Sequence, residues 1–393
     1  MIREALVLGA GIHGLCTAFH LHRMGVRDIL VVDRHEDGHA HGSSHGHTRI
    51  TRSSYADRRW IELAQQAHRR GWRELSAELG EPLLFPTPGL FFGPAAGPFG
   101  AFLAATLGSG ADVERIDVPQ ARRLCPLLHI DDDDAVLLDR TAALVAAERT
   151  LSGLRAWCDA QGIERRANVH VRSVRREPGM IAAETDRGTL RARRVVIAAG
   201  AGTGALVPAE AGRLVVLRQH VGYFQPELPP SALAPGAFPV WARIGTETND
   251  FQYGLPEFGR PGTKLAQHRT EGPADDPEAT GVAADTAALE QLARARFTQS
   301  ARLVGSETCL YTMAPREELQ VRQDGPGLVV VTACSGHALS SAPRSAGTLR
   351  RWRCCPPAER VRLRVPSLVP VSERGARGRE LVAARARPPR RSR

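Results

Sequence analysis

The sequence predicts an α/β fold in which a Rossmann-like, dinucleotide-binding domain is interleaved with a second, sheet-rich α+β domain. Three observations lead to this prediction. A glycine-rich turn follows the first apolar segment, and similar apolar segments recur near residues 195 and 329. The intervening stretches contain short apolar runs typical of strands. Strands of one sheet that recur so far apart imply that the first domain is interrupted twice by insertions.

The first motif is a glycine turn of the GxGxxG type, formed by Gly9, Gly11 and Gly14 after the apolar run Ala-Leu-Val-Leu. Gly9 permits the tight turn, Gly11 lets the backbone approach a pyrophosphate, and Gly14 lets the following helix pack closely on the strand. The N-terminus of that helix offers unpaired N–H groups and a positive dipole end to phosphates.

A second strand, residues 29–32, ends at Asp33 and Arg34, 22 and 23 residues after Gly11. A carboxylate at this place accepts hydrogen bonds from the ribose hydroxyls of an adenosine. We therefore interpret residues 5–34 as a dinucleotide-binding unit, to which Arg34 also contributes. The alternative is a glycine turn in an ordinary α/β unit.

Size and composition set limits on the class of protein. A chain of 393 residues with 42% hydrophobic residues is long enough for about two or three domains. No run approaches the ~20 apolar residues of a membrane helix, and we expect no secretory signal. The seven cysteines are scattered, odd in number and never spaced as CxxC, which favours a reducing cytoplasm.

The net charge of +10 is concentrated at the end of the chain. Residues 344–393 contain 15 Arg against three Glu, so the rest of the chain is close to neutral. Only this tail would attract nucleic acid or anionic lipid. We expect no nucleic-acid or membrane partner, and a genuine basic arm that binds nucleic acid is the alternative.

Lysine usage singles out one residue. Lys264 is the only lysine, and every other basic residue of the Lys and Arg total is Arg. A lysine ammonium is compact and its pKa moves readily on burial, which Arg cannot imitate. Lys264 is therefore a candidate functional residue, with chance survival in a biased composition as the alternative.

The loop over residues 35–47 contains five histidines among glycines and serines. A metal site is one interpretation. No cysteine or acidic ligand accompanies them at fixed spacing, so we favour a flexible loop that lies over a cofactor.

Periodicity predicts the remaining elements. Helices are expected over 57–79, within 98–124, over 142–161 and over 285–297, and the acidic run 131–134 is expected to be a solvated loop. Strands are expected at 83–93, 169–174, 181–184, 189–192, 194–199, 214–224, 239–244, 250–255 and 327–333.

Six segments together resemble the flavin-dependent amine oxidases of the monomeric sarcosine oxidase and N-methyltryptophan oxidase type, within the D-amino-acid-oxidase-like superfamily. The resemblance covers about residues 4–338. Besides the glycine turn with Asp33, the segments are His-Gly-His-Thr-Arg-Ile-Thr-Arg at 45–52, Tyr-Gly-Leu-Pro at 253–256, Lys-Leu-Ala-Gln-His at 264–268, Thr-Cys-Leu-Tyr-Thr at 308–312 and Cys-Ser-Gly-His at 334–337.

The resemblance implies a monomeric enzyme with an FAD-binding domain of the D-amino-acid-oxidase type and a substrate domain. We expect residues 1–82, 142–212 and 309–338 to form the first and residues 83–141 and 213–308 the second. The resemblance also adds five residues to those expected to bind the cofactor: His45, Thr48, Arg49, Gly200 and Gly336.

In that family the cysteine of the Cys-x-Tyr-Thr segment is bonded covalently to the flavin, and Cys309 matches it. A thiolate must then reach the C8 methyl group of the ring. Lys264 matches a lysine near flavin N5 that takes part in the reaction with oxygen. Reducing O2 creates negative charge, which a positioned ammonium stabilises. A buried structural cysteine is the alternative for Cys309.

Further residues match by position. Arg52 matches the arginine that binds the substrate carboxylate through a planar, bidentate fork. Arg49 and His45 match basic residues beside the flavin, where positive charge stabilises the reduced, anionic ring. Tyr253, His268 and Tyr311 match residues that shape the amine pocket, and each is otherwise an ordinary core side chain.

The implied reaction is oxidation of a secondary amine, such as an N-methyl or cyclic amino acid, to an imine with production of H2O2. A dehydrogenase or biosynthetic imine-forming oxidoreductase with the same site is one alternative. An NAD(P)-dependent enzyme, and a catalytically inactive binding protein with a basic tail, are the others.

The sequence departs from the family after residue 338. The family continues Phe-Lys-Phe-x-Pro-x-x-Gly, whose lysine is a second carboxylate ligand, whereas this chain reads Leu-Ser-Ser-Ala-Pro-Arg-Ser-Ala at 339–346. Deleting one base from a GC-rich coding run for Phe-Lys-Phe-Gly-Pro-Ala-Leu-Gly gives this octapeptide. We therefore hypothesise a frameshift at Leu339, which predicts a disordered tail over 339–393 and weak or absent activity.

Overall fold

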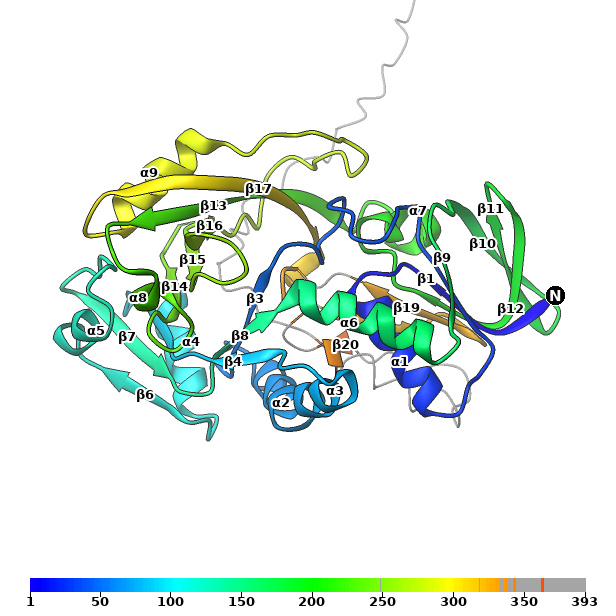
Figure 1. Cartoon of the computed structure of the whole chain (residues 1–393), viewed down its shortest axis with the longest axis horizontal. Helices are drawn as coiled ribbons and strands as arrows, with labels where there is room; N and C mark the ends of the chain where they lie inside the picture. The colour runs from blue at the N-terminus through cyan, green and yellow to red at the C-terminus, as the bar shows by residue number, and fades with distance from the viewer. Residues whose placement is uncertain are drawn as a thin grey trace, which may run out of the picture.

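The computed structural model describes residues 1–247, 249–317, 319–332, 335–337, 339, 342–343 and 362–363. These residues form three β-sheets with helices between and around them (Figure 1). The predicted α/β class, with a Rossmann-like sheet beside a sheet-rich region, is confirmed.

The first sheet has β1 near its centre and follows the order β20-β18-β19-β12-β1-β2-β9, with β11 also paired to β12 and β10 to β11. Strands β19, β12, β1, β2 and β9 run parallel. The bounds are β1 (Ile2–Leu8), β2 (Ile29–Val32), β9 (Glu164–Arg166), β10 (Val171–Glu177), β11 (Met180–Thr185), β12 (Gly188–Ile197), β18 (Leu319–Gln323), β19 (Leu328–Thr332) and β20 (Arg362–Leu363).

Both faces of this sheet are covered, which explains why its strands are continuously apolar. Val7 and Val31 face a core with helices α1 (Ile12–Arg23) and α6 (Ala147–Ala160). Their neighbours Leu6 and Leu30 face the opposite core, beneath β10 and β11. Successive side chains of a strand point to opposite faces, so each apolar run fills two cores.

The second sheet follows the order β17-β13-β16-β15-β14-β5-β7-β6. It is antiparallel except where β14 meets β5, and its long strands β13 and β17 extend over the top of the molecule (Figure 1). The bounds are β5 (Gly89–Pro94), β6 (Val113–Ile116), β7 (Asp134–Asp139), β13 (Val215–Pro226), β14 (Val240–Ile244), β15 (Phe251–Leu255), β16 (Thr263–Gln267) and β17 (Ala301–Met313).

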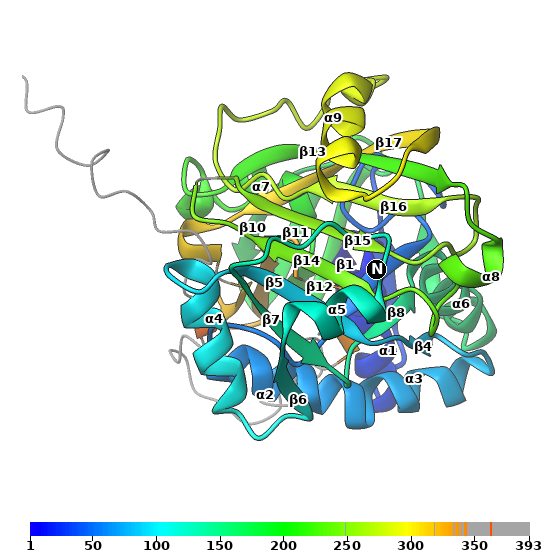
Figure 2. The same ribbon diagram turned by 90° about the vertical axis from the view of Figure 1, so that its left-hand side faces the viewer.

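A small third sheet, β3-β8-β4, joins the two regions. It consists of β3 (Thr48–Thr51), β8 (Ala143–Ala146) and β4 (Leu84–Pro86). Helix α9 lies over β13 and β17 in Figure 2. The other helices are α2 (Arg58–Gln66), α3 (Trp72–Leu79), α4 (Pro98–Leu107), α5 (Val118–Leu124), α7 (Thr203–Leu206), α8 (Pro230–Leu233) and α9 (Thr286–Arg296), with a π turn η1 (Ala67–Gly71) and 3-10 turns η2 (Gly200–Gly202), η3 (Pro208–Glu210) and η4 (Pro315–Glu317).

Several predicted elements differ from those observed. The helix expected from residue 142 begins at Ala147, because residues 143–146 instead form β8 between β3 and β4. The acidic run is a loop only up to residue 133, since Asp134 is buried and opens β7. The sequence did not predict strands β3, β6, β7, β9, β16, β17, β18 and β20. The helix expected over 57–79 is confirmed, with η1 joining α2 to α3.

Most of the tail at 339–393 lies outside the described residues. Of its first residues, Leu339 and Ala342 are buried against the core that α1 covers. The carbonyl oxygen of Pro343 lies 2.8 Å from Nε2 of His20 on α1. The frameshift at Leu339 concerns the coding DNA and stays a prediction. None of the helices in the described part of the chain combines the length and apolar character that spanning a bilayer requires.

Candidate active site

The glycine turn between β1 and α1 has no room for side chains. Gly9 has φ +107°, and a Cβ there would lie 2.3 Å from the Ala198 carbonyl oxygen. A Cβ on Gly14 would lie 1.7 Å from the Gly9 carbonyl oxygen, and one on Gly11 would lie 3.2 Å from Ser44 Oγ. The close approach predicted for helix and strand is therefore present.

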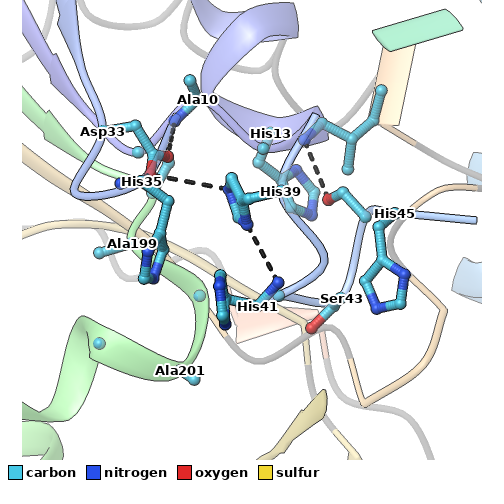
Figure 3. Close-up of a pocket in the computed structure, with 18 of the residues that line it drawn as sticks. Ala10, His13, Asp33, His35, His39, His41, Ser43, His45, Ala199 and Ala201 are labelled. Carbon is cyan, nitrogen blue, oxygen red and sulfur yellow. Dashed lines mark hydrogen bonds and ion pairs between the residues drawn. The ribbon is translucent and has the colours of Figure 1, made fainter. Parts of the chain in front are cut away.

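The turn is linked to the end of β2 by Asp33. The backbone N–H of Ala10 donates to Asp33 Oδ2 at 2.7 Å, and that of His35 donates to Oδ1 at 2.9 Å (Figure 3). The Ile12 N–H at the start of α1 donates to Ser44 Oγ at 3.2 Å, and the first turn of α1 contains no acidic residue. An anion at this helix end would meet backbone N–H donors, and α1 itself places no carboxylate there.

A cavity of about 550 Å³ begins at this turn. Its walls come from the glycine turn, the end of β2, the histidine loop, η2, β17 and the segment after β19. Among the predicted residues, those that line it are Gly9, Gly11, Asp33, Arg34, His45, Arg49, Gly200, Tyr311 and Gly336. Arg34 also forms an ion pair with Glu278 at the rim.

The histidine loop lies along the cavity beside the turn (Figure 3). The rings of His35 and His41 stack with centroids 4.4 Å apart, and His39 lies 4.8 Å from His35. Burial, together with the neighbouring His39, lowers the pKa of His35 to about 4, so the His35 ring is neutral near pH 7. Among the described residues no cluster of three His, Cys, Asp or Glu could hold a metal.

A cluster of charges lies where the loop meets the second sheet. The guanidinium of Arg49 on β3 donates to the carbonyl oxygens of Ser43, His45 and Thr48, each at 2.7 Å, and so holds the loop. Lys264 on β16 is buried, and its Nζ lies 3.7 Å from Oε1 of Glu307, which lines the cavity.

Burial of Lys264, followed by the positive charge of Arg49, lowers the pKa of its ammonium to about 8, and Glu307 acts in the opposite direction. Burial also lowers the pKa of His45 to about 4, with Arg49 as the next cause. The cluster therefore holds two cations and a carboxylate near pH 7, while His45 is neutral.

Alternate residues of β17 face this cluster. Glu307, Cys309 and Tyr311 are two residues apart, so they share one face of the strand. Cys309 is buried within electrostatic reach of both Arg49 and Lys264. Ser43 of the histidine loop donates to the carbonyl oxygen of Leu310, which fixes the loop against β17.

Aromatic side chains continue from this cluster toward α2. The hydroxyl oxygens of Tyr253 and Tyr311 are 3.3 Å apart. The Tyr311 ring lies 5.3 Å from that of His268, which lies 5.9 Å from that of His337. His337 Nε2 is 3.4 Å from a carboxylate oxygen of Glu317. Burial raises the pKa of Tyr253 to about 12 and lowers that of His268 to about 4.

Arg52, the residue after β3, ends this row. Its Cζ lies 4.5 Å from the centroid of Tyr55 and 5.5 Å from that of Phe91, and its Nε donates to the Ser54 carbonyl oxygen at 2.9 Å. Arg52 is buried and is close enough to influence the pKa of His268. The residues that line the cavity do not include seven predicted site residues: Arg52, His268, Tyr253, Lys264, Cys309, Thr48 and Gly14.

Comparison with known proteins agrees with this architecture. The model of the DAO family, described as FAD dependent oxidoreductase, matches residues 4–352. The chain belongs to this family. The family resemblance drawn from its motifs is thereby confirmed, and the matched residues include both the cavity and the charge cluster.

The family members it resembles include sarcosine and amino-acid oxidases. It is 26% identical to the peroxisomal sarcosine oxidase of Mus musculus over 362 residues, which is 86% of this chain and 89% of that protein. It is 24% identical to the N-methyl-L-tryptophan oxidase of Salmonella arizonae over 355 residues, 86% and 91% of the two chains. The open form of NikD, an unusual amino acid oxidase, has a TM-score of 0.78 at 23% identity, covering 93% and 98%.

The cavity fits the FAD that this family uses. Ring nitrogens of His13, His35 and His45 and the hydroxyl oxygens of Thr312 and Thr332 are buried without a hydrogen-bond partner in the described structure, and all five residues line the cavity. Buried polar atoms are rarely left without partners, so a polar ligand is expected here. The glycine cradle would hold its pyrophosphate, and Asp33 its ribose.

The sequence interpretation missed two carboxylates of this site. Glu307 could have been found from strand alternation, since it precedes Cys309 and Tyr311 with a period of two. Glu317 had no comparable signal. It follows the end of β17 in η4, and only the fold brings it against His337.

Proposed function

We propose that this family member is an FAD-dependent oxidase of secondary amines, of which N-methyl amino acids such as sarcosine and cyclic amino acids are the leading candidates. The observation that carries the proposal is the cluster of Lys264, Arg49 and Cys309 beside a cavity that begins at a dinucleotide-binding turn. Sarcosine and N-methyl-L-tryptophan oxidases among its relatives support the substrate class.

Bound FAD would supply the redox chemistry. The C–H next to the amine nitrogen loses two electrons and a proton, the N–H proton is released to solvent and an imine results, while O2 takes up two electrons and two protons to become H2O2. The protein supplies charge and position. The Lys264 ammonium, held in a buried site, stabilises the negative charge that develops on oxygen. Cys309 is the proposed point of covalent attachment to the flavin.

Arg52 is the proposed ligand of the substrate carboxylate. Its guanidinium is stacked on Tyr55, which limits its rotamers before substrate arrives. Tyr253, Tyr311 and His268 would form the wall against which the amine packs. The substrate amine must be neutral to react, and the buried pocket with its two arginines and Lys264 lowers the pKa of an amine placed there.

The proposal extends to organisation and location. We assign cofactor binding to residues 1–82, 142–212 and 309–338 and substrate binding to residues 83–141 and 213–308. All strands of the first sheet except β20 lie within the former set, and all of the second sheet except the end of β17 lies within the latter. We also propose a cytoplasmic monomer; none of the four described cysteines is in a disulfide.

The test uses the purified full chain. We expect a yellow protein with the absorption of bound FAD that forms H2O2 from at least one of sarcosine, N-methyl-L-tryptophan, L-proline and L-pipecolate. A dehydrogenase would give a different result. Such an amine would reduce its flavin under argon, and the reduced flavin would then pass electrons to an added dye but not to O2. A colourless protein that takes up no FAD would refute the proposal.

A further inference from the structure

Glu307 is a carboxylate that the proposed reaction does not yet use. It lines the cavity, and the Tyr223 hydroxyl donates to its Oε1 at 2.6 Å. Lys264 Nζ lies 3.7 Å from the same oxygen, and Arg260 Nη1 lies 3.9 Å from Oε2. Glu307 also adjoins the histidine loop, because a Cβ on Gly46 would be 3.0 Å from its Oε1.

The strand register fixes this arrangement. On the central strand β13, Tyr223 pairs with Lys264 of β16 on one side and with Gly305 of β17 on the other. Glu307 is two residues beyond Gly305 and therefore projects from the same face. Lys264, Tyr223 and Glu307 thus sit on three adjacent strands, with the tyrosine between the two charges.

The surroundings of Lys264 lower the pKa of its ammonium, and only Glu307 and Cys309 act to raise it. Burial disfavours the ammonium most, and the Arg49 guanidinium on β3 disfavours it further. His45, from the loop before β3, is neutral near pH 7 because its burial lowers its pKa to about 4. Burial also opposes ionisation of Glu307, but Lys264 and the Tyr223 hydrogen bond outweigh it and lower the pKa of that carboxyl.

We propose that Glu307 is the positioning residue of this site: it keeps the Lys264 side chain ionised and fixed beside the flavin, so that the reaction with O2 proceeds at neutral pH. Tyr223 orients the carboxylate for this task. The inference rests on the proposed function for the role of Lys264 in reacting with O2, whereas the coupling between the two side chains can be measured without any turnover.

A single lysine makes the coupling directly observable. Because Lys264 is the only lysine of the chain, protein produced with 13Cε-labelled lysine gives one side-chain NMR signal, whose shift against pH reports the pKa of this ammonium. We expect the parent to titrate near pH 8. An opposite charge within about 4–6 Å shifts a pKa by about one to three units, so Glu307→Gln should lower the value by that amount.

Two further variants and a control test whether the carboxylate charge of Glu307 causes the shift in the Lys264 pKa. Glu307→Asp retains the charge and should titrate closer to the parent than the Gln variant does. Tyr223→Phe retains the carboxylate but removes its hydrogen bond, so a smaller decrease is expected. Glu290→Gln removes a carboxylate paired with Arg294 on the exposed face of α9 and should leave the titration unchanged.

The functional consequence is a shifted pH profile. With the flavin reduced chemically, without any amine, the rate of reoxidation by O2 should fall as pH rises through about 8 in the parent. In Glu307→Gln it should fall through a pH lower by the same one to three units. A fold that is merely weakened would lower the rate at every pH and would not move the midpoint.

The outcomes separate the two proposals. If Lys264 titrates at the parent pH in Glu307→Gln, the positioning role is overturned. Should that variant not fold, an unchanged titration in Tyr223→Phe overturns the role instead, because the carboxylate would then not depend on the hydrogen bond that orients it. If the titration shifts as expected but no amine is oxidised, the positioning of Lys264 stands and the proposed function fails.

Discussion

Replacing Gly14 by alanine tests the packing that creates the dinucleotide turn. The added Cβ would lie 1.7 Å from the Gly9 carbonyl oxygen, whereas side-chain carbons essentially never come nearer than 3.0 Å to such an atom. Helix α1 and the turn must therefore separate by about 1.3 Å, the difference between these distances. Since both contacting atoms belong to backbone or are bonded to it, no side-chain rotation relieves the overlap.

The cost of such overpacking is typically about 1–3 kcal/mol of unfolding free energy. We expect Gly14→Ala to lose this amount in urea denaturation and to purify with a markedly lower flavin content, because the helix N-terminus moves relative to the phosphates. Gly204→Ala is the control: this glycine lies in the short helix α7, and no heavy atom outside its own stretch of helix is within 4 Å of the added Cβ. It should be neutral or stabilising by up to about 1 kcal/mol. A Gly14→Ala protein with parent stability and full flavin content would refute the packing argument.

Other predictions concern the chemistry. Acid precipitation should leave the yellow colour in the pellet for the parent and in the supernatant for Cys309→Ser; colour in the supernatant for both would refute covalent attachment. Lys264→Met should slow reoxidation of the reduced flavin by about 10²–10³-fold, with a smaller effect on reduction by amine, as stopped-flow absorbance would show. Arg52→Lys should raise KM for carboxylate-bearing amines at least tenfold and change kcat less, because Lys lacks the bidentate fork. Burial lowers the pKa of His268 from 6.5 to about 4; the unfolded state thus binds the proton first, and the unfolding free energy should fall as pH drops from 6.5 to 4, by ~3 kcal/mol from this residue. His268→Gln should reduce that slope in urea denaturation, and an unchanged slope would show that the ring is accessible to protons.

Motifs and periodicity within short stretches of sequence were sufficient to predict the elements at the cofactor-binding end of the fold. The glycine turn, α1 and β2 follow from signals within one short stretch, and the hydrogen bond from Ala10 to Asp33 joins its two ends. The apolar runs at β12 and β19 were recognisable because strands buried on both faces leave no polar alternation.

Local rules failed where tertiary contacts determine the conformation. Residues 143–146 are a plausible first turn for the helix that follows, yet they pair with β3 and β4, and these contacts override helical propensity. Asp134 belongs to an acidic run, but its neighbour Asp131 uses its backbone N–H to donate to the Asp134 carboxylate, which lets this residue enter β7. Neither partner is visible from spacing in the sequence.

In the candidate site, too, some residues could be found from local sequence motifs, whereas others are brought in only by the tertiary fold. The motifs located Lys264, Arg49 and Cys309, and the structure brings these three together. The partner of Lys264 was not recognised, because a contact with Glu307 depends on how β16 and β17 both align with β13. The sequence contains the residues of this contact, but only the pairing register places them on one face.

Charge compensation in this site comes from one short stretch of chain. A buried cation without a partner is costly, and removing one member of a buried pair is strongly destabilising. Glu307 lies beside Lys264, and Glu317 lies beside His337 within electrostatic reach of Arg52. Both carboxylates lie on β17 or just after it, the stretch that also holds Cys309 and Tyr311. The stretch from β17 to η4 would therefore attach the flavin through Cys309 and also supply both counter-charges, one for the residue that would act on oxygen and one for the residue that would bind the substrate carboxylate. A change in the register of β17 would disrupt all three functions together.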